Sequence, residues 1–187
     1  MTQRSEKPTH FVSEAEFLAL SRESDARLEY AHGVVHAMAG EKKKNNRIAG
    51  NIYSRLLERA DERGCRVCIE GVQLRMPLES KYYLPDVMLS CAPEGDDEYL
   101  EENPCVLVEV ASPTSVIRDY HEKKIEYFKI SALEQYIIVA SDKRQVQVYT
   151  RQGSSLVNDV IEDAGGFSVN CLNLDLTLEQ IYAGVRL

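Results

Sequence analysis

The sequence predicts an α/β fold in which helices flank a mixed β-sheet. Short runs of β-branched and aliphatic residues, typical of buried strands, alternate with segments whose apolar residues recur every three or four positions, typical of helices. The chain has 187 residues, of which 44% are hydrophobic and 28% charged, an ordinary globular composition. This length suits one domain with a sizeable core, and no linker or repeat divides the chain, so we expect a single domain over residues 1–187.

The first half of the chain predicts two helices and several strands. Ser13 with Glu16 three residues later forms a capping box, which predicts a helix at Glu14–Glu23. Gly33 supplies the positive φ of a hairpin turn, and a second helix ends at Gly64. The elements expected after the first helix are strands Arg27–Tyr30 and Val34–Met38, a helix at Asn46–Glu62, strands Arg66–Ile69 and Val72–Met76, and a loop at Leu78–Tyr83.

The second half continues this alternation. Two short apolar runs bounded by Pro, Asn or Gly indicate buried strands, and a helix follows them. The expected elements are strands Val87–Leu89 and Val106–Val110, a helix at Ser115–Lys129, strands Gln135–Ala140, Val146–Thr150 and Leu156–Ile161, and a closing helix at Leu178–Tyr182.

Two acidic residues stand out because they accompany apolar strands. Asp86 opens the run Val87–Leu89, and Glu109 lies inside Val106–Val110. A carboxylate buried among valines loses hydration free energy unless a cation or a hydrogen-bond network compensates it. Mg²⁺ takes oxygen ligands and keeps several waters, one of which can become an attacking hydroxide. The two acids therefore indicate a divalent metal site.

A lysine on the following helix completes a candidate catalytic group. Lys123 lies three residues after Tyr120 and four before Tyr127, so helical spacing places it on the stripe that faces inward. An ammonium beside metal-bound carboxylates stays charged and can orient a water or stabilise the charge of a phosphorane. Lys124 lies on or beside the same stripe, and periodicity leaves both lysines open.

The order of these residues resembles a known family of nucleases. The matching segments are Leu28-Glu29-Tyr30 with Gly33, Met38-Ala39-Gly40, Pro85-Asp86, Glu109-Val110-Ala111-Ser112-Pro113-Thr114, Asp119, Glu122-Lys123, Tyr127 and Glu134-Gln135-Tyr136-Ile137-Ile138-Val139. They span nearly the whole chain and are similar to the restriction-endonuclease-like family, formerly a domain of unknown function, of the PD-(D/E)XK nuclease superfamily. The standard superfamily lysine stands two residues after the second acid, where this chain has Ala111, and the family resembled moves it onto the helix.

The resemblance implies a restriction-endonuclease-like form of the α/β fold and roles for particular residues. It selects Lys123 over Lys124, adds the backbone carbonyl of Val110 to the two acids as a metal ligand, and makes Glu29 an auxiliary carboxylate near the metal. The alternative for Glu29 is an exposed strand residue. The chain departs from the family at Asn45, where many members carry a histidine, and at Lys124, which replaces a usually apolar residue.

Charge and hydropathy restrict the possible partners. A net charge of −8 counts against a protein that coats nucleic acid nonspecifically. Lys42-Lys43-Lys44 with Arg47 forms the dense basic cluster, either a local phosphate-binding patch or a solvated helix entrance. No apolar run approaches the ~18 residues of a membrane helix, and residues 1–8 contain no apolar signal core. We therefore expect a cytoplasmic protein with no membrane partner.

The cysteines predict no metal or redox site. Five cysteines at irregular spacing fit thiols in a reducing cytoplasm better than a disulfide framework. Cys65 and Cys68 have the spacing of a zinc or redox pair, but a structural zinc needs a second close pair. Cys91, Cys105 and Cys171 are isolated in the sequence, so inert thiols are expected.

Two classes of function are compatible with these residues. The first is an endonuclease that uses Asp86, Glu109, Lys123 and Glu29, with Mg²⁺ or Mn²⁺ as cofactor and DNA as the expected nucleic-acid substrate. A homodimer is expected with it, because cutting both strands of a duplex takes two active sites. The second is a nuclease-fold protein without catalytic activity that serves as a binding or regulatory module. The acid–lysine group favours the first class, and the negative net charge favours the second.

Overall fold

The structure is a computed structural model that describes residues 11–38, 40–111 and 118–187, apart from the side chains of residues 118–121. The helices are α1 Glu14–Glu23, α2 Lys43–Glu62, α3 Arg118–Tyr127 and α4 Leu178–Ile181, with a 3₁₀ turn η1 at Asn170–Leu172. The strands are β1 Leu28–Ala31, β2 Val34–Ala37, β3 Arg66–Ile69, β4 Gln73–Arg75, β5 Lys81–Tyr83, β6 Val87–Ser90, β7 Leu100–Glu101, β8 Val106–Ala111, β9 Gln135–Ala140, β10 Gln145–Gln152, β11 Ser155–Glu162, β12 Gly166–Val169 and β13 Leu174–Thr177.

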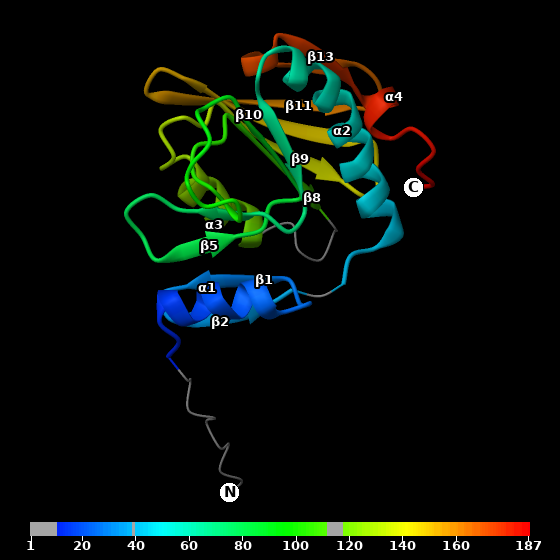
Figure 1. The fold of residues 1–187 in the computed structure, drawn as a ribbon. Coiled ribbons are helices and arrows are strands. Elements are labelled where there is room, and N and C mark those ends of the chain that lie inside the picture. Colours follow the sequence, from blue (N-terminus) through cyan, green and yellow to red (C-terminus); the bar gives the residue numbers. More distant parts are fainter. Residues whose placement is uncertain (1–10, 39, 112–117) are drawn as a thin grey trace, which may run out of the picture.

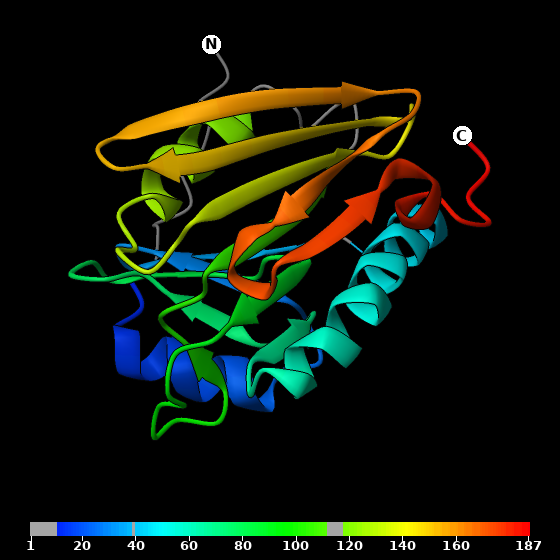
Figure 2. The same cartoon turned by 90° about the horizontal axis from the view of Figure 1, so that it is seen from above.

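The main sheet is mixed, as the sequence predicts. Its strand order is β11-β10-β9-β8-β6-β3, in which β8 and β9 pair in parallel and the other neighbours are antiparallel. A second sheet has the order β2-β1-β5-β4-β7, and β12 pairs with β13. The layer made by α1, β1 and β2 lies beside β5 in Figure 1. Figure 2 shows β13 and α4 next to α2.

The two faces of β8 pack against different helices because successive side chains on a strand point to opposite sides. Val106, Val108 and Val110 belong to the core cluster that contains the buried face of α2. Leu107 and Ala111 belong to a second cluster that contains Tyr127 at the end of α3. The sheet therefore lies between α2 and α3, as Figure 1 shows.

The helices form where the sequence patterns predict them, with shifted bounds: α3 ends at Tyr127, two residues before the expected Lys129, and α4 ends at Ile181, one residue before Tyr182. The capping box of Ser13 and Glu16 forms, and α1 has the expected bounds. Helix α2 begins at Lys43, three residues before the expected Asn46, because its polar first turn carries no hydrophobic periodicity. The expected start of the third helix at Ser115 and the side chain of Tyr120 lie outside the described part of the structure.

The strands require three corrections. The expected loop Leu78–Tyr83 contains strand β5, because burial of Tyr82 against the aromatic rings of α1 and β1 favours pairing with β1 and β4. The strand expected at Val72–Met76 is shorter, Gln73–Arg75. Strands β7, β12 and β13 were not predicted, since β7 has two residues and the other two have four residues each, most of them not buried. The turn of the first hairpin is as expected, with Gly33 at φ 90°.

The expectation of inert thiols is wrong for four of the five cysteines. Cys65 is bonded to Cys91, and Cys105 to Cys171, whereas Cys68 is free. The partners are 26 and 66 residues apart, so no local spacing reveals them. Among the described residues, no helix is long and apolar enough to span a membrane.

Arg151 on β10 fixes the segment that follows α3. Its Nε donates to the carbonyl of Leu133 at 2.8 Å, and its Nη2 donates to the carbonyls of Phe128 at 2.8 Å and Ile130 at 2.9 Å. The guanidinium also lies over the Phe128 ring, 5.3 Å from its centroid. A single planar fork thus satisfies carbonyls that follow the helix and joins them to the sheet.

We expect Arg151→Lys to destabilise the fold by about 1–3 kcal/mol, because one ammonium cannot reach all three carbonyls and leaves some unpaired. Urea unfolding followed by circular dichroism measures this loss. Arg55→Lys, on the exposed side of α2, is the matched control and should leave the midpoint unchanged. Equal midpoints for Arg151→Lys and the wild type would contradict this role.

A candidate acidic active site between the sheet and α3

Alternation along the strands brings both predicted acids to the face that α3 covers. In β8, Glu109 lies between the α2-facing residues Val108 and Val110, so its side chain is on the α3 side. In β6, Val87 packs in the α2 cluster and Met88 in the α3 cluster, which puts Asp86 on the α3 side as well. Both acids are buried, each with 7% of its surface exposed.

Asp86 is buried, and the described residues place little positive charge next to it. Its Oδ2 accepts a hydrogen bond from the backbone N–H of Val110 at 2.7 Å, and its Oδ1 lies 3.6 Å from Nη2 of Arg27. Burial raises the pKa of Asp86 to about 7, and the negative charge of Glu109 adds to this increase. A further cation next to Asp86 would therefore stabilise its carboxylate form.

Glu109 is more completely compensated. Its Oε1 accepts hydrogen bonds from Nζ of Lys123 at 3.0 Å and from the hydroxyl of Tyr127 at 2.8 Å. Burial raises the pKa of Tyr127 well above its ordinary value, and Glu109 adds to the effect, so this hydroxyl remains a donor. The arrangement supplies the hydrogen-bond network that a buried glutamate requires.

Lys123 links two strands of different sheets. Its ammonium donates to Oε1 of Glu109 and, at 3.1 Å, to Oε1 of Glu29 on β1. Burial lowers the pKa of Lys123, but Glu109 and Glu29 outweigh that effect and raise it above its ordinary value. Lys124 points elsewhere, with its Nζ over the Tyr149 ring at 4.5 Å from the centroid. Helical periodicity did not distinguish the two lysines, but their contacts do: Lys123 binds the acids and Lys124 does not.

Glu29 is not the exposed strand residue of the alternative interpretation. Only 17% of its side chain is exposed, and its Oε1 accepts from Lys123 and from the backbone N–H of Leu84 at 3.3 Å. Glu29 thereby joins the hairpin of β1 to the segment that precedes Asp86.

The sequence patterns did not identify two residues that contribute to the site, Tyr127 and Arg27. Tyr127 was on the predicted inward stripe, and its position four residues after Lys123 was the signal that it could reach the same acid.

Arg27 precedes β1, and nothing in its sequence neighbourhood marks it. Its Nε and Nη2 are buried and lack a hydrogen-bond acceptor within the described part of the chain. Nη2 also lies 3.6 Å from Asp86, and buried donors without a hydrogen bond suit an additional oxygen ligand.

Glu41, two residues before α2, acts on the acidic site. Its charge contributes to the raised pKa of Asp86, and the residues directly after it carry positive charge. These residues are the basic cluster of Lys42, Lys43 and Lys44, of which the first two are exposed. Asn45 follows as a buried residue whose Oδ1 has no partner in the described residues.

The donor set suits a hard divalent cation. Asp86 and Glu109 offer carboxylate oxygens, the ligands that Mg²⁺ and Mn²⁺ prefer. The N–H and C=O of one strand residue point to the same edge, so the Val110 carbonyl lies on the side where its N–H meets Asp86. These three residues could hold one ion, with Lys123 and Glu29 next to it.

Comparison with known proteins finds a family model that matches most of the chain. A family model named Uma2, with the description "Putative restriction endonuclease", matches residues 14–179. Two uncharacterized proteins of Synechocystis sp. are similar: slr1290 is 22% identical over 178 residues, with 93% of each chain covered, and sll1609 is 24% identical over 148 residues, covering 78% of this chain and 84% of that protein.

A solved structure has the same fold. It is the crystal structure of "a putative nuclease belonging to DUF820" from Anabaena variabilis, with a TM-score of 0.75, 17% sequence identity, and coverage of 94% of this chain and 99% of that chain. The restriction-endonuclease-like α/β fold expected from the sequence is thereby confirmed.

The hydrogen bond from the Tyr127 hydroxyl to Glu109 should contribute to the stability of the fold. Tyr127→Phe keeps the ring but removes one donor from Glu109, so we expect a loss of about 1 kcal/mol in the free energy of unfolding. Chemical denaturation measures it, with Tyr99→Phe on the exposed surface as the control. If both variants unfold at the wild-type midpoint, the bond to Glu109 does not contribute.

Proposed function

The chain belongs to the Uma2 family of restriction-endonuclease-like proteins, and on this premise we propose that it is a metal-dependent endonuclease that hydrolyses phosphodiester bonds in DNA. One observation carries the proposal: two buried carboxylates, Asp86 and Glu109, share one face of the sheet with a lysine whose ammonium is 3.0 Å from Glu109. Burying three ionisable groups is costly, and hydrolysis of a phosphodiester uses all three.

Asp86, Glu109 and the Val110 carbonyl would hold Mg²⁺, with Mn²⁺ as a substitute. When bound, the ion supplies Lewis-acid activation of a water molecule. Asp86 supports this assignment because the cation that it pairs with among the described residues, Arg27, is 3.6 Å away and does not form a close hydrogen-bonded ion pair. The acids thus require a charge that the described residues do not fully supply.

Lys123 would act on the reacting groups as a fixed positive charge. Its ammonium, held between Glu109 and Glu29, can orient the attacking water and stabilise the negative charge that grows on the phosphate oxygens. Glu29 would serve as the auxiliary carboxylate by holding Lys123 in position, because a lysine with one carboxylate partner could rotate away.

Phosphate recognition would use positive charge that is local to the site. Arg27 has buried donors without acceptors in the described chain, and the exposed Lys42 and Lys43 directly follow Glu41, whose charge acts on Asp86. Such a patch can bind a DNA backbone although the whole chain carries a net charge of −8. A twofold homodimer would supply one such site for each strand of a duplex.

The roles of the two lysines can be separated by mutation. We expect Lys123→Ala to reduce Mg²⁺-dependent cleavage of plasmid and branched DNA at least ~100-fold, since it removes a charge that acts in the transition state. Lys124→Ala, the adjacent control, should retain turnover within a few fold because its ammonium lies over Tyr149. Nicking and cleavage are measured on gels across DNA and RNA substrates.

Metal affinity provides the second readout. By calorimetry, Lys123→Ala should bind Mn²⁺ much as the wild type does, whereas Asp86→Ala should lose binding. Cleavage by Lys123→Ala at the wild-type rate would refute the proposed role of the lysine. Mn²⁺ binding by the wild type without cleavage of any substrate would favour the alternative, a nuclease-fold binding module.

A further inference from the structure

A cysteine cluster lies at the far end of the strands that carry the acids. Asp86 precedes β6 and Cys91 follows it, so the two are roughly 16 Å apart along an extended chain. Cys105 directly precedes β8, on the same side as Cys91. The cluster is therefore separate from the acidic site, and its chemistry does not depend on nuclease activity.

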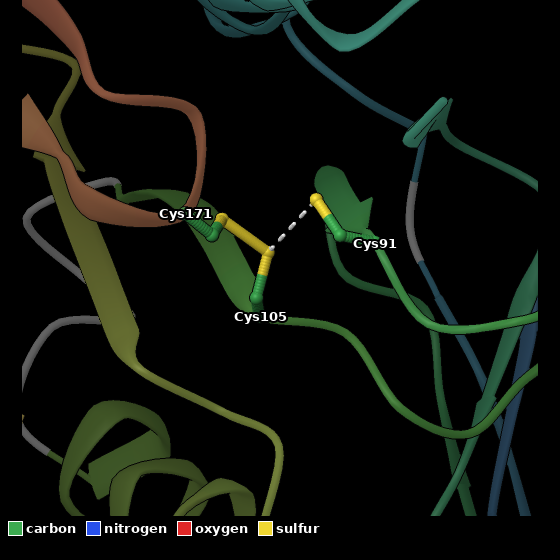
Figure 3. A group of neighbouring side chains, drawn as sticks. All are labelled: Cys91, Cys105 and Cys171. Carbon is green, nitrogen blue, oxygen red and sulfur yellow. Dashed lines mark hydrogen bonds between the residues drawn. A yellow bond between two sulfur atoms is a disulfide. The ribbon is translucent and has the colours of Figure 1, made fainter. Parts of the chain in front are cut away.

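Four segments of the chain converge at this point. The pairing of Arg66 with Ser90 puts Cys65 beside Cys91, to which it is bonded. The N–H of Cys105 donates to Leu89 at 2.8 Å, which brings the third sulfur to the same strand ends. The turn η1 supplies Cys171, which is bonded to Cys105 (Figure 3).

Three of the four sulfurs are as close as ligands of one metal ion, and the fourth, that of Cys65, is bonded to Cys91. The Sγ atoms of Cys91, Cys105 and Cys171 all lie within 4.8 Å of one another, and Cys105 and Cys91 are 3.9 Å apart, the contact dashed in Figure 3. Four sulfurs at about 2.3 Å from a tetrahedral Zn²⁺ are separated by about 3.8 Å. The gap between the two bonded pairs therefore matches one edge of a zinc–thiolate tetrahedron.

Three arginines donate to the backbone beside the cysteines. Arg66 donates to the carbonyl of Ala92, next to Cys91, at 2.9 Å, and it also pairs with Glu101. Arg59, which also pairs with Glu62, and Arg63 donate to the carbonyl of Leu172, next to Cys171, at 3.3 and 3.4 Å. Arg63 in particular adds positive charge near a site that would carry two negative charges with four thiolates and one Zn²⁺.

We propose that Cys65, Cys91, Cys105 and Cys171 form a structural zinc site when they are reduced. Two equivalents of a dithiol reductant convert both disulfides to four thiols, with two equivalents of oxidised dithiol as the other product. The four thiols then bind one Zn²⁺ and release four protons. Four sulfur ligands leave no open coordination position, so this ion is structural and not catalytic.

Such a site would hold the C-terminal segment against the main sheet. Cys171 lies in η1 between β12 and β13, whereas the other three cysteines border β3, β6 and β8. The unfolded chain does not assemble the four ligands, so the free energy of zinc binding would stabilise the folded arrangement of that segment. Zinc should thus raise the unfolding midpoint of the reduced protein.

The test uses the full chain, reduced without oxygen and titrated with Co²⁺ and then Zn²⁺. We expect one Co²⁺ per chain with the sulfur-to-cobalt charge-transfer absorption of a tetrahedral thiolate site, displaced by one equivalent of Zn²⁺. Cys105→Ser and Cys171→Ser should lose this absorption. Cys68→Ser is the matched control, because Cys68 is the free cysteine of the described chain, and should keep it.

Alkylation of the wild type tests the same site without any substitution, and so does not depend on whether the variants fold. Zn²⁺ should slow iodoacetamide modification of the four cluster cysteines by at least ~10-fold and leave Cys68 unchanged, as read by mass spectrometry. Absence of the cobalt–thiolate absorption, equal alkylation with and without Zn²⁺, or two disulfides that resist the dithiol would each overturn the proposal.

Discussion

The burial of Glu109 in β8 is the constraint on which the rest of the acidic site depends. A glutamate with valines on both sides cannot remain charged unless donors reach it, and Lys123 and Tyr127 reach it from α3. That requirement fixes the rotation of α3 about its axis. The same lysine also connects α3 to β1, because its second partner is Glu29. One buried charge thus adds to the apolar packing of Leu74 and Met76 that joins the two sheets.

The two acids differ in how far the described residues compensate their charge. Glu109 has two side-chain donors, whereas Asp86 has a backbone N–H and a more distant arginine. A site with every charge paired would be a structural network. The partial pairing of Asp86, together with the donors of Arg27 that lack acceptors in the described chain, is what an incoming cation and an anionic substrate would complete. Local charge, and not the net charge of −8, decides which partner the site suits.

Most of the fold and part of the site could be predicted from sequence because they depend on local pattern. The capping box fixed α1, and acids inside apolar strands drew attention to Asp86 and Glu109. The choice of Lys123 needed the family resemblance, since adjacent helical residues differ only by rotation. Arg27 and the cysteine cluster could not be found this way, because their partners come from strands and turns distant in sequence. Strand β5 was missed for the same reason, since tertiary burial of Tyr82 outweighs its turn-like neighbours.

The central claim, that the acid pair binds a divalent ion, is tested most directly by anomalous diffraction from crystals soaked in Mn²⁺. We expect a single strong peak in contact with the carboxylates of Asp86 and Glu109 and with the carbonyl of Val110, while Lys123 stays beside Glu109. A contradictory result would be no peak there, with both acids bonded only to the arginine, lysine and tyrosine that already surround them.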